Sequence, residues 1–385
     1  MGLPARPHAN LFHHRDTFDV LNRDLSVDQK IESLREILKG RFPFIQRISV
    51  ALYDPKTDIL RTYLAVGDGD NRLQRYAAKL SDAASLAEIV QRGSPRVVND
   101  LGVFDREGRE HTRKIREAGY GASYTLPMYL SDVFFGFVFF NSRAREVFTE
   151  EVLHYLDVFG HLISLVVINE VASIRTLQAS VKTAASLVHQ RDVDTGSHLD
   201  RMANFARLIA REVATLHALT DEKIEHIFLF APLHDIGKIA IADTILKKPG
   251  KLSLDEFEDM KAHTAKGLAI IDVMLSNFGL EGLQHVDMLR NIALYHHEAM
   301  NGSGYPAGLR GADIPIEARI VAVADIFDAL TSTRPYKEAW TIEEAFATLR
   351  KMAGTQVDRD CVEALISCRE EVEQIQRRFR EDPYG

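Results

Sequence analysis

The chain has little of what would mark a secreted, membrane-spanning or nucleic-acid-binding protein. Its 385 residues include 2 cysteines, Cys361 and Cys368, which is too few for a disulfide framework and predicts free thiols in a reducing cytoplasm. The formal net charge is −8, so no overall positive field attracts nucleic acid. The longest uninterrupted apolar run, residues 133–140, is far shorter than the ~20 residues of a membrane span. We therefore expect a cytoplasmic protein with no membrane and no nucleic-acid partner.

The composition is that of a folded protein of more than one domain. Hydrophobic residues make up 46% of the chain and charged residues 26%, as in ordinary soluble domains, and the length suits two domains. The pattern of elements divides the chain into an N-terminal tail (1–25), which lacks the layout of a signal peptide, a mixed domain (26–165), a connecting helix (150–190) and a helical domain (172–385).

The first half predicts a small α+β domain. Residues 26–40 carry a helical pattern with Ser26 as its cap, and residues 45–53 and 59–66 read as strands around a turn. A helix over 80–92 and a short strand over 96–98 follow, and a hairpin spans 123–129 and 133–141.

This half resembles a GAF domain, a sheet-and-helix sensor module. The resemblance lies in ISVALYDPKTDILRTYLAVG, SPRVVNDL, YTLPMYLSDVFFGFVFFNS and the closing TEEVLHYLDVFGHLISLVV. It implies a domain that binds a small molecule of unknown identity or that has no ligand and serves structure or dimerisation. No Cys or His is placed to nominate a haem or a bilin.

The connecting helix carries an apolar stripe with steps of three and four residues, the pattern of a helix seam. We expect the stripe to form a parallel homodimer that transmits a signal, and the alternative is packing of the helix on its own domains. The stripe consists of Val152, Leu156, Phe159, Ile163 and Val166 and then Ile174, Leu177, Val181, Ala184 and Val188.

The second half is mostly helical in pattern and concentrates histidines and aspartates in short clusters. Imidazole nitrogen and carboxylate oxygen suit borderline and hard divalent metals, and the number of such residues is too large for one ion. Two close ions can turn a bridging water into hydroxide and clamp a phosphate ester. Other histidines, namely His189, His217, His226 and His285, are expected to be ordinary core or capped residues. The candidate ligands are Asp194, His198, His234, Asp235, His263, His296, His297 and Asp325.

The order of these motifs resembles the HD-GYP family of metal-dependent phosphohydrolases. The chain has His-Asp followed by Gly-Lys, His-His followed by Glu and Gly-Tyr-Pro, and then DIFDAL and RPYK. The resemblance implies an all-helical HD-type domain with two or three divalent ions, iron or manganese, that hydrolyses cyclic di-GMP to pGpG or onward to GMP. The fold class is thus multidomain: a GAF-like α+β sensor, a long linker helix and an all-α phosphohydrolase domain.

The resemblance also implies roles for single residues. Asp235 would bridge two ions, and Lys238 would face the scissile phosphate, so these two are the catalytic candidates. Gly304, Tyr305 and Pro306 form the GYP loop, and Arg334 and Lys337 would meet substrate phosphates. The side chain of Tyr305 either stacks on a purine or packs the loop onto the domain, and Gly302 and Gly304 would let the backbone approach the ligand.

One position departs from the family pattern. Members with three metals usually carry Glu where this chain has Asp194, and Asp is one methylene shorter. We therefore expect two ions and a third only if Asp194 reaches it, with slow or absent cleavage of pGpG if it does not.

The leading hypothesis is a cyclic di-GMP phosphodiesterase regulated by its GAF-like domain, with signalling proteins as further partners. The alternatives are a weakly active or inactive cyclic-di-GMP-binding signalling protein and a hydrolase of another cyclic dinucleotide such as cyclic GMP-AMP.

Overall fold

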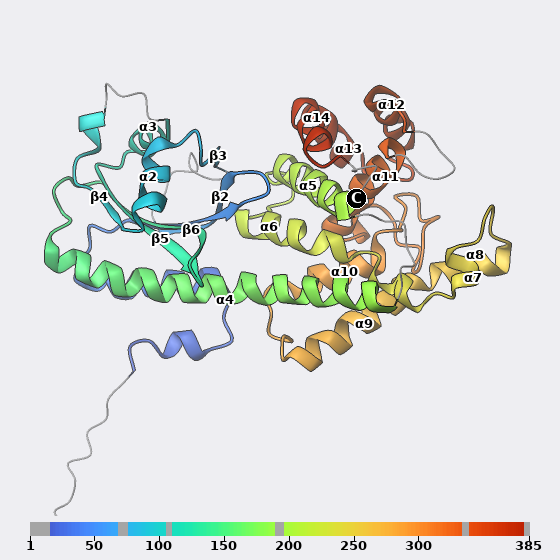
Figure 1. The fold of residues 1–385 in the computed structure, drawn as a ribbon, viewed down its shortest axis with the longest axis horizontal. Coiled ribbons are helices and arrows are strands. Elements are labelled where there is room, and N and C mark those ends of the chain that lie inside the picture. The colour runs from blue at the N-terminus through green and yellow to red at the C-terminus, as the bar shows by residue number, and fades with distance from the viewer. Residues whose placement is uncertain (1–15, 68–75, 105–109, 189–195, 333–338, 381–385) are drawn as a thin grey trace, which may run out of the picture.

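The computed structural model describes residues 16–67, 76–104, 110–188, 196–332 and 339–380. They form a sheet domain, a long helix and a helical domain (Figure 1). The predicted fold class is confirmed.

The sheet domain is a six-stranded antiparallel sheet of strand order β3-β2-β1-β6-β5-β4. Its strands are β1 (Arg47–Asp54), β2 (Ile59–Gly67), β3 (Ala77–Lys79), β4 (Arg96–Val98), β5 (Ala122–Leu130) and β6 (Val133–Ser142), and its helices are η1 (Asp19–Asn22), α1 (Val27–Arg41), α2 (Ala84–Arg92), η3 (Leu101–Phe104) and α3 (Glu110–Glu117).

The predicted elements of this domain occur close to where the sequence places them. Ser26 caps α1 through a capping box with Gln29, which satisfies backbone donors that a helix start leaves free. The helix runs one residue past Gly40, and α2 begins at Ala84 rather than at residue 80. The short strand β3 and the helix α3 were not predicted.

The helix α4 (Glu150–Val188) is 39 residues long and runs along both domains (Figure 1). It contacts α1, β5 and β6 of the sheet domain and the short 3-10 helices η4 (Ala231–Leu233) and η5 (Ile236–Ala240) of the helical domain. Leu156 and Ile163, in the predicted stripe, are fully buried. They belong to one apolar core that includes residues of the sheet domain, of α4 and of the helical domain.

The stripe on α4 packs inside its own chain, which contradicts its predicted role as a dimer seam. Each of Val152, Phe159, Ile174 and Leu177 is at least 95% buried, and Val166 packs against the same core. Intramolecular packing and a coiled coil share the same spacing of apolar residues. The side chains of Val181, Ala184 and Val188 lie outside the described residues.

Residues 150–180 of α4 have the length and apolar composition to cross a membrane, and 44% of their most apolar window is buried. Counting uninterrupted apolar residues overlooked this stretch because polar residues are interspersed through it. Buried core helices meet the same criterion, and α4 packs on both domains.

The helical domain is built around α5, which packs against α6, α11 and α13. In its described part there is no strand, only the isolated bridges Asn301–Arg310 and Ala353–Val357. Both cysteines are free and buried in its core. Its elements are α5 (Gly196–Val213), α6 (Asp221–Phe230), η4 (Ala231–Leu233), η5 (Ile236–Ala240), α7 (Asp243–Leu246), α8 (Leu254–Lys261), α9 (His263–Phe278), α10 (Val286–Tyr295), η6 (Gly311–Asp313), α11 (Ile316–Thr331), α12 (Ile342–Met352), α13 (Arg359–Ser367) and α14 (Arg369–Arg378).

Candidate metal centre

Seven of the eight predicted ligands lie together, in two adjoining groups. Within each group the potential ligand atoms lie within 4.8 Å of one another. One group comes from the residue before η5, the start of α9 and the residues after α10. The other comes from α5, the residue after η4 and α11. The first group is Asp235, His263, His296 and His297, and the second is His198, His234 and Asp325. The eighth predicted ligand, Asp194, lies outside the described residues.

The Asp235 carboxylate joins the two groups. Its Oδ1 lies 3.2 Å from His263 Nε2 and 3.5 Å from His296 Nε2. Its Oδ2 lies 3.2 Å from His234 Nε2. One oxygen thus faces each group, which is the arrangement that a bridging carboxylate requires.

The protein fixes the tautomers of its histidines through their Nδ1 atoms. His234 Nδ1 lies 2.9 Å from the Ala231 carbonyl oxygen, and His263 Nδ1 lies 2.7 Å from that of Met260. His296 Nδ1 lies 2.9 Å from the Ile292 carbonyl oxygen. A carbonyl oxygen can only accept, so each Nδ1 carries the proton and each Nε2 presents a lone pair to the centre, as a metal ligand must.

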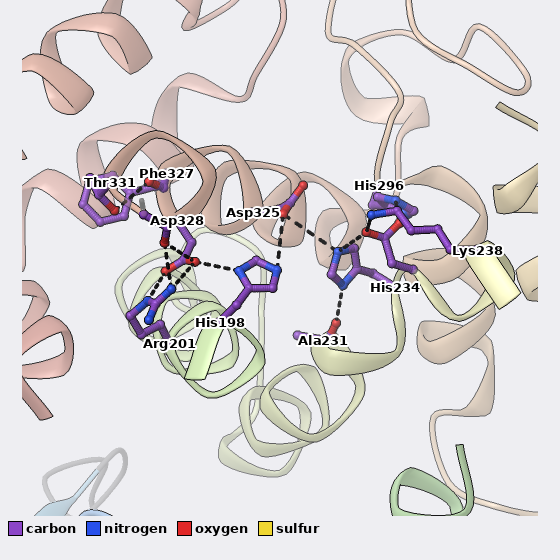
Figure 2. A network of polar contacts seen from close by, with 12 residues as sticks. His198, Arg201, Ala231, His234, Lys238, His296, Asp325, Phe327, Asp328 and Thr331 are labelled. Atoms are coloured by element: carbon purple, nitrogen blue, oxygen red, sulfur yellow. Dashed lines mark hydrogen bonds and ion pairs between the residues drawn. The ribbon is translucent and has the colours of Figure 1, made fainter. Parts of the chain in front are cut away.

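His198 is oriented by a buried carboxylate, Asp328, whose role the sequence did not reveal. His198 Nδ1 lies 2.6 Å from Asp328 Oδ2, which leaves its Nε2 4.0 Å from Asp325 Oδ1 (Figure 2). Arg201 donates to both oxygens of Asp328, through Nε at 2.6 Å and Nη2 at 3.0 Å. Burial raises the pKa of Asp328, but the hydrogen bonds from His198 and Arg201 lower it more, so the carboxyl stays ionised.

Burial and charge act on the central residues in opposite directions. Burial alone would raise the pKa of Asp235, yet the neighbouring His234 and Lys238 cations hold it well below its usual range. Burial alone would lower the pKa of His234, and Asp235 and Asp325 raise it to about 9. A proton and a divalent cation therefore compete for the same nitrogen.

The paired histidines of the first group are held neutral. Burial lowers the pKa of His296, and burial together with the neighbouring His296 lowers the pKa of His297 to about 2. The two rings lie 4.1 Å apart between centroids. Neutral imidazole is the form that binds metal.

The residues present fit a pair of divalent cations. Among the described side chains, buried His234 Nε2 and Asp235 Oδ1 have no hydrogen-bond partner, which is costly unless a ligand completes them. Two groups of nitrogen and oxygen donors joined by a carboxylate suit two ions better than one.

The turn that carries these ligands depends on close backbone contact. A Cβ on Gly237 would lie 1.8 Å from the His263 carbonyl oxygen and 2.5 Å from Gly267 N. Only glycine lets η5 approach α9 this closely, and that approach brings Asp235 against His263.

Lys238, which the sequence predicts to face the scissile phosphate, lies beside Asp235. Its Nζ is 2.7 Å from Asp235 Oδ2, and its side chain is 25% exposed. It can therefore donate to an anion that lies beside the bridging carboxylate.

The GYP loop follows the histidine pair and folds back on it. A Cβ on Gly304 would lie 2.2 Å from Ala299 N, so this glycine is required by the packing of the loop on its own backbone. The Tyr305 ring lies 4.8 Å from that of His297, which favours the packing role among the two considered for this tyrosine. Pro306 follows it in the same loop.

A second unpredicted residue, Glu298, holds this loop. Its buried carboxylate accepts hydrogen bonds from Ala307 N at 2.7 Å and Leu309 N at 2.9 Å. The sequence shows a Glu after the histidine pair, but only the fold reveals these partners. The two predicted phosphate-binding residues, Arg334 and Lys337, lie outside the described residues.

Comparison with known proteins agrees with this geometry. Residues 182–361 match the family model of the HD domain. The chain is 46% identical over 195 residues to the cyclic di-GMP phosphodiesterase response regulator RpfG of Xanthomonas campestris, covering 51% of this chain and 49% of that protein. It is 40% identical over 196 residues to a cyclic di-GMP phosphodiesterase of Thermotoga maritima, covering 51% and 50%.

Another relative is named for a different substrate. The 3'3'-cGAMP-specific phosphodiesterase 2 of Vibrio cholerae is 39% identical over 191 residues, which cover 50% of this chain and 34% of that protein. The chain thus spans half or less of the length of these relatives.

Solved structures similar to the chain include GAF domains. A GAF domain/HD domain protein of Geobacter sulfurreducens has a TM-score of 0.32 and 16% identity, covering 39% of this chain and 96% of that one. The GAF domain of an Acinetobacter phosphotransferase has a TM-score of 0.33 and 13% identity, covering 40% and 90%. These TM-scores are too low to identify a fold, so the sheet domain is characterised by its own strand order.

Proposed function

We propose that this chain, whose residues 182–361 match the family model of the HD domain, is a metal-dependent phosphodiesterase that hydrolyses cyclic di-GMP to pGpG. The carrying observation is that Asp235 joins two clusters of metal-type donors whose Nε2 atoms face inward. Sequence similarity to cyclic di-GMP phosphodiesterases supports the choice of substrate.

A pair of bound ions would supply a hydroxide nucleophile at neutral pH and neutralise charge on the phosphate. We assign Asp235, His263, His296 and His297 to one ion and His198, His234 and Asp325 to the other. Asp328 holds His198 in the tautomer that exposes Nε2. Lys238 would donate to a non-bridging phosphate oxygen, whose charge grows in the transition state, and so would lower the barrier.

We assign substrate recognition to the GYP loop and to the basic pair Arg334 and Lys337. The Tyr305 ring beside His297 and the hydrogen bonds to Glu298 hold the loop against the centre. A guanidinium fork and an ammonium suit the two phosphates of a cyclic dinucleotide.

Product analysis on a nucleotide panel tests the assignment. The full-length protein should convert cyclic di-GMP faster than 3'3'-cGAMP, with pGpG as the first product. Faster hydrolysis of 3'3'-cGAMP would show that cGAMP is the substrate and would leave the proposed metal chemistry unchanged. Hydrolysis of cGAMP is the second candidate function, and the 39% identity to a cGAMP-specific enzyme supports it. Tight binding without turnover would mark a signalling receptor instead.

We propose iron or manganese as the resident metals, because mixed imidazole and carboxylate ligands suit both ions. A third ion would need Asp194, and its presence should be accompanied by cleavage of pGpG to GMP. Metal analysis of protein purified without oxygen, together with the end product, tests both points.

We further propose a homodimer that uses the exposed face of α4. The side chains of Tyr155, Val158 and Leu165 are 37%, 56% and 66% exposed, and their spacing continues through Leu162 as a helix seam. Light scattering on the wild type and on Val158→Glu/Leu165→Glu should give a dimer and a monomer, and an unchanged mass would remove this face as the interface.

We also propose that the protein acts in the cytoplasm and that the GAF-like domain regulates it, with or without a small-molecule ligand. The two free buried thiols are consistent with a reducing compartment. Cell fractionation tests the first point, and comparison of turnover with and without residues 1–149 tests the second.

A further inference from the structure

A second cluster of metal-type donors lies where the sheet domain, α4 and the helical domain meet. Glu222 and His226 come from α6, and His285 caps the start of α10. Their ligand atoms lie within 4.8 Å of one another. None of the three belongs to the candidate catalytic centre, and both histidines were expected to be ordinary core or capped residues.

The donors of this cluster are buried and unpartnered. His226 is fully buried and Glu222 is 5% exposed. Among the described residues, Glu222 Oε1, His226 Nε2 and His285 Nε2 are buried atoms without a hydrogen-bond partner. Three converging donors left unsatisfied in a core are costly unless a cation or water completes them.

The tautomer of His226 is already the one that a metal needs. Its Nδ1 lies 2.8 Å from the Glu222 carbonyl oxygen, one helical turn earlier. That carbonyl can only accept, so Nδ1 carries the proton and Nε2 offers its lone pair to the cluster.

A fourth donor comes from the long helix. Glu170 Oε1 of α4 lies 3.8 Å from His226 Nε2, and His285 Nε2 lies 3.8 Å from Glu222 Oε1. Gln284 N donates to Glu170 Oε1 at 2.9 Å, which orients this carboxylate. Tetrahedral zinc with bonds of about 2.1 Å holds its ligands ~3.4 Å apart, which is close to these two separations. Glu170 is not among the three residues whose ligand atoms all lie within 4.8 Å of one another, so its carboxylate has to move toward the other donors to complete the set.

We propose that Glu222, His226 and His285, with Glu170 as the fourth ligand, form a second divalent-metal site of the zinc type. Two imidazoles and two carboxylates around one point suit Zn²⁺ better than Mg²⁺ or Ca²⁺, which prefer oxygen ligands alone. The side chain of His285 is 21% exposed, so an ion can enter from solvent.

An ion at this position would connect α4 to helices that lead to the candidate catalytic centre. It ties α4 to the start of α10, and the residue that follows α10 is His296 of the candidate catalytic centre. The helix α6, which carries His226, leads through η4 to His234. Tyr63 of β2 packs 6.1 Å from the His226 ring, so the sheet domain also borders the site.

Zinc counting on the full-length protein tests the proposal. Wild type, His226→Gln and His285→Gln would be stripped with chelator, reloaded with Zn²⁺, desalted and measured by mass spectrometry. His217→Gln is the matched control, because His217 also has a buried unpartnered Nε2 and lies outside the cluster. Both cluster variants should bind one ion per chain fewer than wild type, and the control should bind the same number.

A second readout guards against variants that fold poorly. Zn²⁺ should raise the melting temperature of His234→Ala/Asp235→Ala protein, whose catalytic centre is disabled, and adding His285→Gln should remove that rise. Equal zinc content in wild type and both cluster variants would overturn the proposal and leave a water-filled polar cluster. Loss of one ion from His217→Gln as well would also overturn it.

Discussion

Replacing Asp328 by Asn should weaken one of the two catalytic ions and spare the other. Asp328 accepts from His198 Nδ1 at 2.6 Å and from Arg201 Nε and Nη2. It is fully buried. An amide of the same shape keeps one acceptor oxygen but loses the charge, so His198 is no longer held firmly in the tautomer that exposes Nε2.

The expected size follows from these contacts. Charge-assisted hydrogen bonds contribute about 1.5–3 kcal/mol each, and loss of a partner that orients a ligating His typically costs 10–100-fold in metal affinity. We expect that loss at the ion held by His198, His234 and Asp325, with the ion at Asp235, His263, His296 and His297 retained.

The assay is competitive metal titration against a chelator, with turnover measured on the same samples. Asp358→Asn is the matched control, because Asp358 forms a comparable buried pair with Arg319 at 2.7 Å and caps α13 instead of orienting a predicted ligand. It should lose stability and keep both ions. Unchanged affinity in Asp328→Asn, or equal loss of both ions, would refute the proposed role of Asp328.

Three further substitutions probe the same centre. Gly237→Ala should lower the melting temperature and the metal content together, because its Cβ would meet the His263 carbonyl oxygen at 1.8 Å and overpacking costs about 1–3 kcal/mol. Gly282→Ala is the control: a Cβ there would meet open space, so neither quantity should change. Wild-type metal content in Gly237→Ala would contradict the predicted clash. Lys238→Ala should lower kcat by roughly 10²–10³, the usual effect of removing a transition-state donor, with metal content near normal; parallel loss of metal would make its role structural. Glu298→Gln should raise KM more than it lowers kcat, because one of its two hydrogen bonds to the GYP loop is lost; an unchanged KM in steady-state kinetics would show that the loop does not contact substrate.

Most of the candidate site could be predicted from the sequence because its ligands occur in short motifs of neighbouring residues. Histidine and aspartate occur as short motifs in a fixed order, and seven of the eight residues so identified lie together in the structure. Asp328 and Glu298 were not assigned roles, because their partners depend on the fold. Asp328 bonds a histidine 130 positions away, and no pattern along the chain encodes such a contact.

In the fold, too, the elements with a clear local sequence pattern were predicted, and the contacts between distant parts of the chain were not. The hairpins were predicted from strand-like segments separated by turns. In contrast, α3 has the polar sequence EHTRKIRE, and β3 has only three residues, so neither shows a recognisable pattern. The apolar stripe was correctly placed on a helix, but the prediction that a second chain covers it was wrong. The spacing of apolar residues is the same whether a second chain or the helix's own domains cover the stripe.

Turnover of cyclic di-GMP by protein purified without oxygen, with metals counted on the same sample, tests the central claim most directly. The account predicts hydrolysis to pGpG or GMP with both catalytic ions bound, and loss of turnover and of those ions in His234→Ala/Asp235→Ala. Turnover retained in that variant, or full metal occupancy without hydrolysis in the wild type, would contradict it.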